Sequence, residues 1–306
     1  RWVDCNNTRF RYGLPEKVGG WSSLITDTIV GVARREFAFV DLDGNRYVAI
    51  GTDKFLLIYF EGQLYDITPL KTTLTSATIA TTNTSTICSI TTGTNHNLSI
   101  GDIVLLDTVT LPVGTGYVDA DFENKLFQVT SITSATVFTI TQSTAATATV
   151  GTGGSISVKP YEPVGPAEQS YGYGWGIDTW SNGKWGEAAS ASDVSLEPGL
   201  WSLSNFGQVL VATIANGKTF TWNAGDAARL TTRASTTTSG FQTTNNPTAT
   251  RVSLVSPTTR HLIHLGTETT IGDPTTQDDM FIRFSDQEDI NDYVPTAINS
   301  AGSQRL

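Results

Sequence analysis

The chain has 306 residues, of which 39% are hydrophobic and 16% are charged. It is therefore long enough to bury a large core and to form more than one folded unit. Asp and Glu outnumber Lys and Arg by 29 to 19, which gives a formal net charge of -10. So acidic a chain is poorly suited to gripping DNA phosphates or an anionic membrane surface. The charge is compatible with lining a conduit through which DNA slides without sticking.

Two features of the chain concern its compartment and its ends. Cys5 and Cys88 lie far apart, and a single pair in so long a chain predicts two reduced thiols rather than a disulfide framework. No run reaches the roughly 18 apolar residues that a membrane-spanning helix needs. The sequence has neither an initiator Met nor a signal peptide, and we expect it to be an ordered part of a longer chain.

Residues 1–70 form the first expected block, and Thr and Gly are frequent while helical periodicity is rare throughout the chain. Residues 13–21 are rich in Gly and Pro and predict irregular turns. The pairs Asp43-Gly44 and Glu61-Gly62 separate apolar runs, which predicts an antiparallel meander. The expected strands are Ile29–Ala33, Glu36–Leu42, Tyr47–Gly51, Phe55–Phe60 and Gln63–Ile67.

Residues 71–160 form a second block, in which 12 of the 20 residues from Thr72 to Thr91 are Thr or Ser. Such a composition suits either a disordered linker or a small β-domain. We favour a small barrel or sandwich, because alternation persists and places Cys88 and Ile90 on one face of a strand. Further expected strands are Ile103–Leu106, Leu126–Ile132, Thr136–Thr141 and Ser155–Val158.

Residues 161–306 begin with a Gly-rich and aromatic connection over 161–200 and continue as strands. The expected strands are Trp201–Leu203, Gln208–Ile214, Thr219–Trp222, Val252–Val255, His261–Leu265 and Met280–Phe284. The segment 55–67 is similar to 209–222, since each has an apolar strand, a Gly turn and a strand with aromatic residues. Units of three or four strands every 40–50 residues predict β-propeller blades, here partial or irregular and interrupted by the Thr-rich block.

The connection holds the candidate binding residues of the chain, because large rings recur there between glycines. Aromatic faces offer apolar area that can stack on sugars, and they also serve as anchors at subunit interfaces. A third role is structural, in which the rings pin the connection to a sheet. The candidates for interface or sugar-stacking contacts are Tyr171, Tyr173, Trp175, Trp180 and Trp185.

Candidate catalytic or metal-binding groups are few. His96 lies in an expected turn, while His261 and His264 are three apart on an expected strand and should point to opposite faces, so they cannot share a metal. An acidic cluster could supply a glycosidase carboxylate pair or a calcium site, and otherwise forms a solvated loop. Its members are Asp278, Asp279, Asp286, Glu288, Asp289 and Asp292. We expect no enzyme activity, no cofactor and no metal.

Three segments resemble virion structural proteins of tailed bacteriophages. They are residues 9–21 (RFRYGLPEKVGGW), the aromatic run 171–186, and residues 281–299. The third is similar to a "RWSDQEDxxDWxPTxxN" pattern, with Phe284 and Tyr293 where Trp is usual. Residues 95–104, 127–132 and 138–140 resemble a small β-domain inserted in many tail proteins, with Asn97 where Gly is usual.

Among phage parts, the nozzle or tail-tube protein of short-tailed phages is the best match. The resemblance implies a propeller with an inserted β-domain and a homo-oligomeric ring of six copies. It also implies docking to portal-adaptor or other tail proteins, and passage of DNA without specific binding. The expected location is the virion tail, assembled in the host cytoplasm. The alternatives are a receptor- or carbohydrate-binding tail module and, third, a propeller-type glycoside hydrolase.

Overall fold

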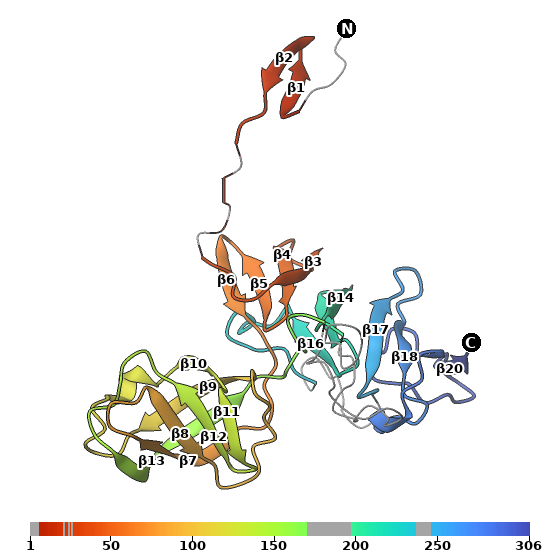
Figure 1. The fold of residues 1–306 in the computed structure, drawn as a ribbon. Helices are drawn as coiled ribbons and strands as arrows, with labels where there is room; N and C mark the ends of the chain where they lie inside the picture. The colour runs from red at the N-terminus through yellow and green to blue at the C-terminus, as the bar shows by residue number, and fades with distance from the viewer. Residues whose placement is uncertain (1–5, 21, 24, 26, 170–196, 237–245) are drawn as a thin grey trace, which may run out of the picture.

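The computed structural model describes residues 6–20, 22–23, 25, 27–169, 197–236 and 246–306 (Figure 1). This part of the chain is all-β, as predicted: it contains no α-helix, and short 3-10 turns occur at Asp119–Asp121 and Pro274–Thr276. Neighbouring strands pair antiparallel in each of its sheets. None of the described segments is a helix of the length and apolarity needed to cross a membrane.

Three small sheets follow one another along the chain, with the strands of each in sequence order, as in propeller blades. The first sheet comprises β3 (Ala33–Val40), β4 (Arg46–Thr52), β5 (Leu56–Phe60) and β6 (Gln63–Asp66). The second comprises β14 (Trp201–Phe206), β15 (Val209–Ile214) and β16 (Thr219–Asn223). The third comprises β17 (Thr250–Val255), β18 (Leu262–Thr267), β19 (Phe281–Phe284) and β20 (Gly302–Arg305).

The three sheets stack through their faces and fan out from their first strands. β14 contacts both β3 and β17, so the first strands of the three sheets lie side by side. Trp222 and Tyr47 belong to the core between the first and second sheets, and Val211 and Leu262 to the core between the second and third. The second sheet is thus covered on both faces, which explains why successive residues of β15 are buried from Leu210 to Ile214. The arrangement is that of irregular propeller-like blades.

Close approach of the first two sheets depends on one glycine. Gly51 in β4 faces Trp201 of β14, and a Cβ atom built on this glycine would lie 2.7 Å from Cδ1 of the indole ring. The indole Nε1 donates a hydrogen bond of 3.0 Å to the carbonyl oxygen of Thr52. The missing side chain therefore makes room for a ring that is both packed and hydrogen-bonded.

The Thr-rich block forms one curled sheet of seven strands in the order β10-β9-β13-β7-β8-β12-β11. The curl brings β10 near β12 and encloses a separate core, in which Cys88, Ile90, Phe138 and Ile140 are fully buried. The alternation predicted for 87–91 is confirmed. The bounds are β7 (Leu74–Thr81), β8 (Ile87–Thr91), β9 (Ile103–Thr110), β10 (Lys125–Gln128), β11 (Ser131–Ser134), β12 (Val137–Thr141) and β13 (Val150–Pro160).

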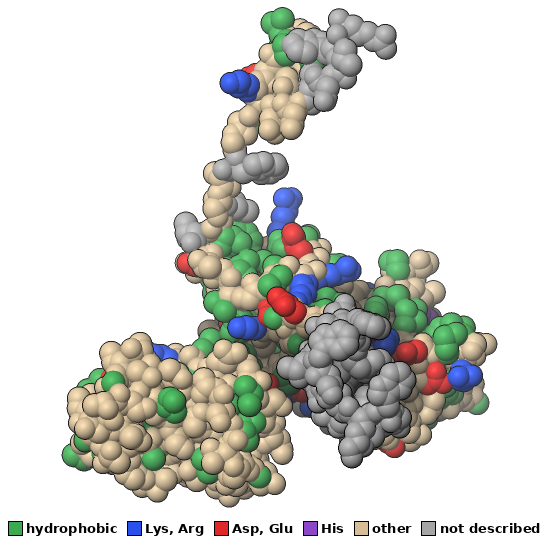
Figure 2. Space-filling model, in the orientation of Figure 1, with side chains coloured by type: hydrophobic (Ala, Val, Ile, Leu, Met, Phe, Trp, Pro, Cys, Tyr) green, Lys and Arg blue, Asp and Glu red, His purple; other side chains and the backbone are tan. Residues whose placement is uncertain are grey.

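The chain enters and leaves the curled sheet at one narrow neck. Leu70 and Tyr161 form an antiparallel bridge there. The amide of Lys71 donates to the Pro160 carbonyl at 2.8 Å, and that of Glu162 to the Pro69 carbonyl at 2.9 Å. Figure 2 shows that the lobe beyond the neck has a mostly uncharged polar surface, as its Thr and Ser content requires.

Two expected strands differ from those observed. Ile29–Ala33 is not a strand before Ala33, because Gly31 has a φ of 90° and the Val32 amide donates to the Asp53 carboxylate instead of a ladder. Leu126–Ile132 is divided into β10 and β11, since the Val129 amide donates to the Asp102 carbonyl between them.

The two halves of the expected internal repeat occupy different positions in their sheets. The segment 55–67 forms β5 and β6, the third and fourth strands of the first sheet. The segment 209–222 instead forms β15 and β16, the second and third strands of the second sheet. Both are hairpins with a Gly turn, so local hairpin chemistry rather than position in a blade produced the similarity.

A separate hairpin precedes the first sheet. β1 (Thr8–Arg11) pairs with β2 (Leu14–Lys17) through a turn in which Tyr12 and Gly13 both have positive φ. The prediction of irregular turns over 13–21 is therefore wrong for residues 14–17, which pair as a strand. Figure 1 shows this hairpin standing well away from the other sheets. We refer to residues 6–18 as the arm.

Candidate functional site

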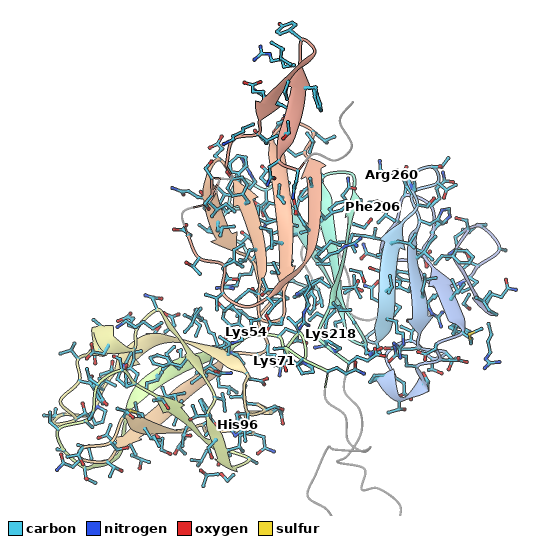
Figure 3. All side chains as sticks on the ribbon, turned by 45° about the horizontal axis from the view of Figure 1, so that its top comes forward. Lys54, Lys71, His96, Phe206, Lys218 and Arg260 are labelled. Carbon is cyan, nitrogen blue, oxygen red and sulfur yellow. The ribbon has the colours of Figure 1, made fainter. Side chains whose placement is uncertain are left out.

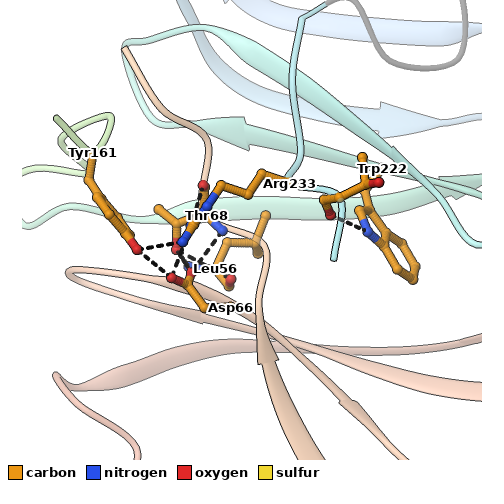
Figure 4. Close-up of polar contacts among 7 residues, drawn as sticks. Leu56, Asp66, Thr68, Tyr161, Trp222 and Arg233 are labelled. Atoms are coloured by element: carbon orange, nitrogen blue, oxygen red, sulfur yellow. Dashed lines mark hydrogen bonds and ion pairs between the residues drawn. The ribbon is translucent and has the colours of Figure 1, made fainter. Parts of the chain in front are cut away.

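A polar cluster joins the curled sheet to the first two blades (Figure 4). Asp66 ends β6, Tyr161 directly follows β13, and Arg233 lies in the loop after β16. These three positions are far apart in the sequence, and each comes from a different sheet. We call Asp66, Thr68, Tyr161 and Arg233 the clamp.

The clamp is closed by charge-assisted hydrogen bonds. Arg233 Nη1 lies 2.9 Å from Asp66 Oδ2, and the Tyr161 hydroxyl donates to the same oxygen at 2.6 Å. Arg233 Nη2 donates to the Tyr161 hydroxyl oxygen at 2.7 Å, and the guanidinium carbon lies 4.7 Å from the centre of the Tyr161 ring. Bonds between such groups are stronger than neutral ones and are directional. The cluster therefore fixes the neck against the blades.

The backbone of the first sheet is tied into the same cluster by Thr68. The Thr68 carbonyl accepts from Arg233 at 3.0 Å, and its hydroxyl accepts from the Leu56 amide at 2.9 Å. Burial, and then the neighbouring Asp66 carboxylate, raise the pKa of Tyr161 well above its ordinary value. The phenol stays protonated and serves as a hydrogen-bond donor, so the geometry of the clamp is that of a structural lock.

A cleft opens beside the clamp, between the curled sheet and the second blade. It has a volume of about 540 Å³, and its lining combines uncharged polar residues, including Thr72, Asn95 and Ser235, with apolar and charged ones. Lys71, beside the neck, and Lys218, in the turn between β15 and β16, also line it (Figure 3). The volume is in the range of small-ligand sites, and the lining offers hydrogen-bond donors and acceptors suited to hydroxyl-rich molecules.

The charges in the cleft are largely compensated. Lys218 Nζ lies 2.9 Å from Glu162 Oε1, and Lys71 Nζ lies 3.8 Å from Asp102 Oδ2. His96, predicted to lie in a turn, is buried; its Nδ1 accepts from the Leu98 amide and its Nε2 lies 3.0 Å from the Ser134 carbonyl. Both ring nitrogens are thus engaged in holding the loop, and His96 is a structural residue of the cleft wall.

The acidic cluster predicted over 278–292 forms the loop between β19 and β20 and its flanks. Asp286 Oδ1 accepts from the amide of Ser300 at 2.7 Å and from its hydroxyl at 2.6 Å. The hydroxyl and amide of Ser300 lower the pKa of Asp286. Asp292 Oδ2 accepts from Asn299 Nδ2 at 2.7 Å. These two carboxylates therefore hold distant parts of the loop together by hydrogen bonds.

The other members of the cluster are also occupied. Glu288 Oε2 lies 3.0 Å from Arg260 Nε, which stacks over the Phe206 ring beside it (Figure 3). Asp279 lies 2.6 Å from Arg251 Nε, and Asp278 lies 2.6 Å from Arg305 Nε. Asp289 Oδ1 accepts from the Asn291 amide at 2.8 Å. Within the described residues, no group of three or more His, Cys, Asp or Glu side chains is placed to hold a metal ion.

The two neighbouring histidines lie in different surroundings. His264 in β18 is fully buried between the second and third blades, where its Nε2 lies 3.0 Å from the Tyr293 hydroxyl and its Nδ1 3.2 Å from the Thr250 hydroxyl. Burial and the Arg283 guanidinium lower the pKa of His264 to about 3. His261 precedes the strand, and its Nε2 lies 3.0 Å from the Ser300 hydroxyl.

The aromatic candidates of the connection lie outside the described residues. They are Tyr171, Tyr173, Trp175, Trp180 and Trp185, and Cys5 also lies outside. Their predicted roles stay predictions. Cys88 is a buried free thiol, and burial raises its pKa.

Sequence reasoning missed the clamp. No pattern around Asp66, Tyr161 or Arg233 distinguishes them from other residues of their type, and the pairing depends on three sheets meeting. The available signal was indirect: two segments that flank an inserted domain must come together.

Comparison with known proteins adds little to this geometry. No family model matches the chain, and no curated protein matches it. Among solved structures, a phage phi92 endosialidase aligns over 96% of this chain and 40% of its own, with 14% sequence identity and a TM-score of 0.26. The chain thus spans well under half of that protein, and so low a score carries no argument. The described residues define an all-β protein with irregular propeller-like blades and a curled inserted sheet.

Proposed function

We propose that this protein is a structural subunit of a bacteriophage tail, of the nozzle or tube type, without enzyme activity. The observation that carries the proposal is the side-by-side placement of β3, β14 and β17, which makes three sheets radiate like blades. Three radiating blades, with the curled sheet held against them by the clamp, are suited to forming part of the wall of a hollow assembly. The phage-like motifs of the sequence add support where they lie at sites of structural importance.

The motif at 281–299 illustrates this support. Tyr293, which stands where Trp is usual, is fully buried and contacts His264 between two blades. Ile290 belongs to the same core. The acidic residues of the motif close the loop that carries these two side chains. The motif therefore supplies side chains that fill the core between the second and third blades.

The proposed assembly is a ring of six copies in the virion tail, built in the host cytoplasm and docked to portal-adaptor or other tail proteins. DNA would pass through it during ejection without specific contacts. The net charge of -10 supports this role, since like charges disfavour adhesion of the DNA backbone.

The proposal is tested on purified particles. Antibodies against the chain should label the tail tip in electron micrographs, and the protein should be present in virions in a fixed ratio to the portal protein. A protein absent from washed particles would refute the tail role.

A second function, binding of a receptor glycan, is favoured by one observation, the polar cleft of about 540 Å³ beside Lys71 and Lys218. A glycan array should then show binding that Lys71→Ala and Lys218→Ala weaken. A matched control is Lys125→Ala, which changes an exposed lysine of β10 that does not line this cleft. An array without signal would dispose of this function and leave the structural one intact.

A further inference from the structure

The arm carries apolar side chains on a hairpin too small to bury them. Tyr12 is 92% exposed, Leu14 70% and Val18 48%. All four residues of β2 are exposed. A two-stranded hairpin is marginally stable by itself, so this arm needs a surface to pack on.

The arm also carries the opposite charge to the rest of the molecule. It holds Arg9, Arg11 and Lys17 against a single acid, Glu16, in a chain of net charge -10. A surface that receives the arm should therefore be apolar and lie among acidic residues.

The third blade offers such a surface on the face that points away from the second blade. Cross-strand pairing places Val252 beside Leu265, and Ile263 between Leu254 and Phe284. Val252 is 46% exposed and Leu254 39% exposed. We call this set, together with Ile282, the open face. Its members belong to none of the buried core clusters of the described residues.

The open face lies in an acidic part of the chain. Residues 246–306 contain eight Asp or Glu and four Arg, with no Lys. A cationic apolar arm and an apolar face on a segment of net negative charge are complementary in both hydrophobicity and charge. Exposed apolar sheet surface of this kind marks an interaction site.

We propose that the arm of one copy packs on the open face of the third blade of the next copy. The arm leaves the first blade, whereas the open face is at the far end of the stack, with the second blade between them (Figure 1). A contact between opposite ends of identical subunits is head-to-tail, and such contacts close into rings when the rotation permits. The inference deepens the proposed function and rests on it for the existence of an assembly.

The test uses three full-length variants and their oligomeric state by analytical ultracentrifugation. The arm variant is Tyr12→Ser with Leu14→Ser, and the face variant is Val252→Lys with Leu254→Lys. The control is Ile100→Ser with Val113→Ser, which removes two similarly exposed apolar side chains from the curled-sheet lobe. Wild type and control should assemble, while the arm variant and the face variant should each sediment as monomers with unchanged circular dichroism.

A mixture of the arm variant and the face variant tests whether the arm of one copy binds the open face of another. An arm variant keeps its open face and a face variant keeps its arm, so an equimolar mixture should yield two-chain complexes and nothing larger. An arm variant that assembles like wild type, a mixture that remains monomeric, or a monomeric wild type would each overturn the inference.

A trapping experiment covers the case in which a variant misfolds. In a Cys5→Ser background, a chain with Leu14→Cys and a size-tagged chain with Leu254→Cys should form a mixed disulfide on mild oxidation. A single chain that carries both substitutions is oxidised in parallel. A disulfide that forms within that chain, but not between the two singly substituted chains, would overturn the proposal in favour of self-packing. Absence of the protein from virions would refute the tail role without affecting this contact, so the two failures are distinguishable.

Discussion

At the scale of single residues, the interface between the second and third blades is unusual for its polar content. Thr213 Oγ1 lies 2.6 Å from Ser253 Oγ and 2.7 Å from Thr219 Oγ1, all fully or almost fully buried. His264 and Tyr293, both of the third blade, form a further buried hydrogen-bonded pair at this interface. Buried polar groups are tolerated when each has a partner, and they then restrict the packing to one arrangement.

The buried imidazole of His264 makes stability pH-dependent. Its pKa is about 3 in the folded protein against 6.5 for an exposed histidine. Between these values the unfolded chain binds a proton that the native state does not, so stability must fall as the pH is lowered. We expect a slope of about 1.4 kcal/mol per pH unit below pH 6. Urea unfolding at a series of pH values between about 7 and 5 measures it.

His264→Gln should flatten this slope over the same pH range, because Gln does not titrate. The matched control is His261→Gln, which changes the neighbouring histidine outside the core and keeps the buried imidazole of His264, so its slope should stay steeper than that of His264→Gln. Equal slopes in wild type and His264→Gln would contradict the assignment.

The clamp can be opened by one substitution. Arg233→Met keeps much of the side-chain volume but removes the cation that pairs with Asp66 and the donors to the Thr68 carbonyl and the Tyr161 hydroxyl. We expect a loss of about 1.5–3 kcal/mol in the free energy of unfolding, as for other hydrogen bonds to charged groups. Arg46→Met, at an exposed position of β4, should change it by less than about 0.5 kcal/mol. Chemical denaturation compares the two, and equal effects would argue against the clamp.

At the scale of elements, the packing of the first blade on the second depends on backbone proximity at Gly51. Gly51→Ala should cost about 1–3 kcal/mol, because the new methyl group overlaps the Trp201 ring. Gly93→Ala is the control, since a Cβ there would meet no atom within 4 Å. Thermal melts of both variants, read by near-ultraviolet circular dichroism, test the difference. A Gly51→Ala protein as stable as wild type would contradict the prediction, because it would show that the Trp201 ring can move away from the new methyl group without a loss of stability.

Strands can be predicted from the sequence where one face of the strand is buried and the other is exposed. Cys88 and Ile90 alternate with polar residues, and β8 lies at that position. The strand β20 was missed because its residues are polar or small and mostly exposed, and carry no apolar signal. Gly31 breaks an apolar run that otherwise resembles a strand, so composition alone misled the prediction for 29–32. The clamp could not be predicted, because contacts between residues 66 and 233 depend on tertiary packing.

At the scale of the whole molecule, the core of the curled sheet and the core between the first two blades are separate clusters on either side of the neck. Phe138 is fully buried in the curled sheet and Leu210 in the blades. Phe138→Ala and Leu210→Ala should each cost about 2–5 kcal/mol, but in different units. Hydrogen exchange should show Phe138→Ala lowering protection mainly over 74–160, and Leu210→Ala mainly over the blades. A uniform loss of protection in both variants would mean that the molecule opens as a single cooperative unit.

The neck has a consequence for how such a protein can change over time. Because Leu70 and Tyr161 are bridged, the curled sheet is joined to its host by two adjacent strands, and excising it would leave chain ends close enough for a short turn to reconnect. A replacement module would also have to cover the apolar residues of the first blade, such as Phe55 and Leu57, that cluster with Ile103 and Leu105 of the lobe. Lineages could replace the lobe with another folded module, or laboratories could graft a cargo there, while the fan of blades kept its shape.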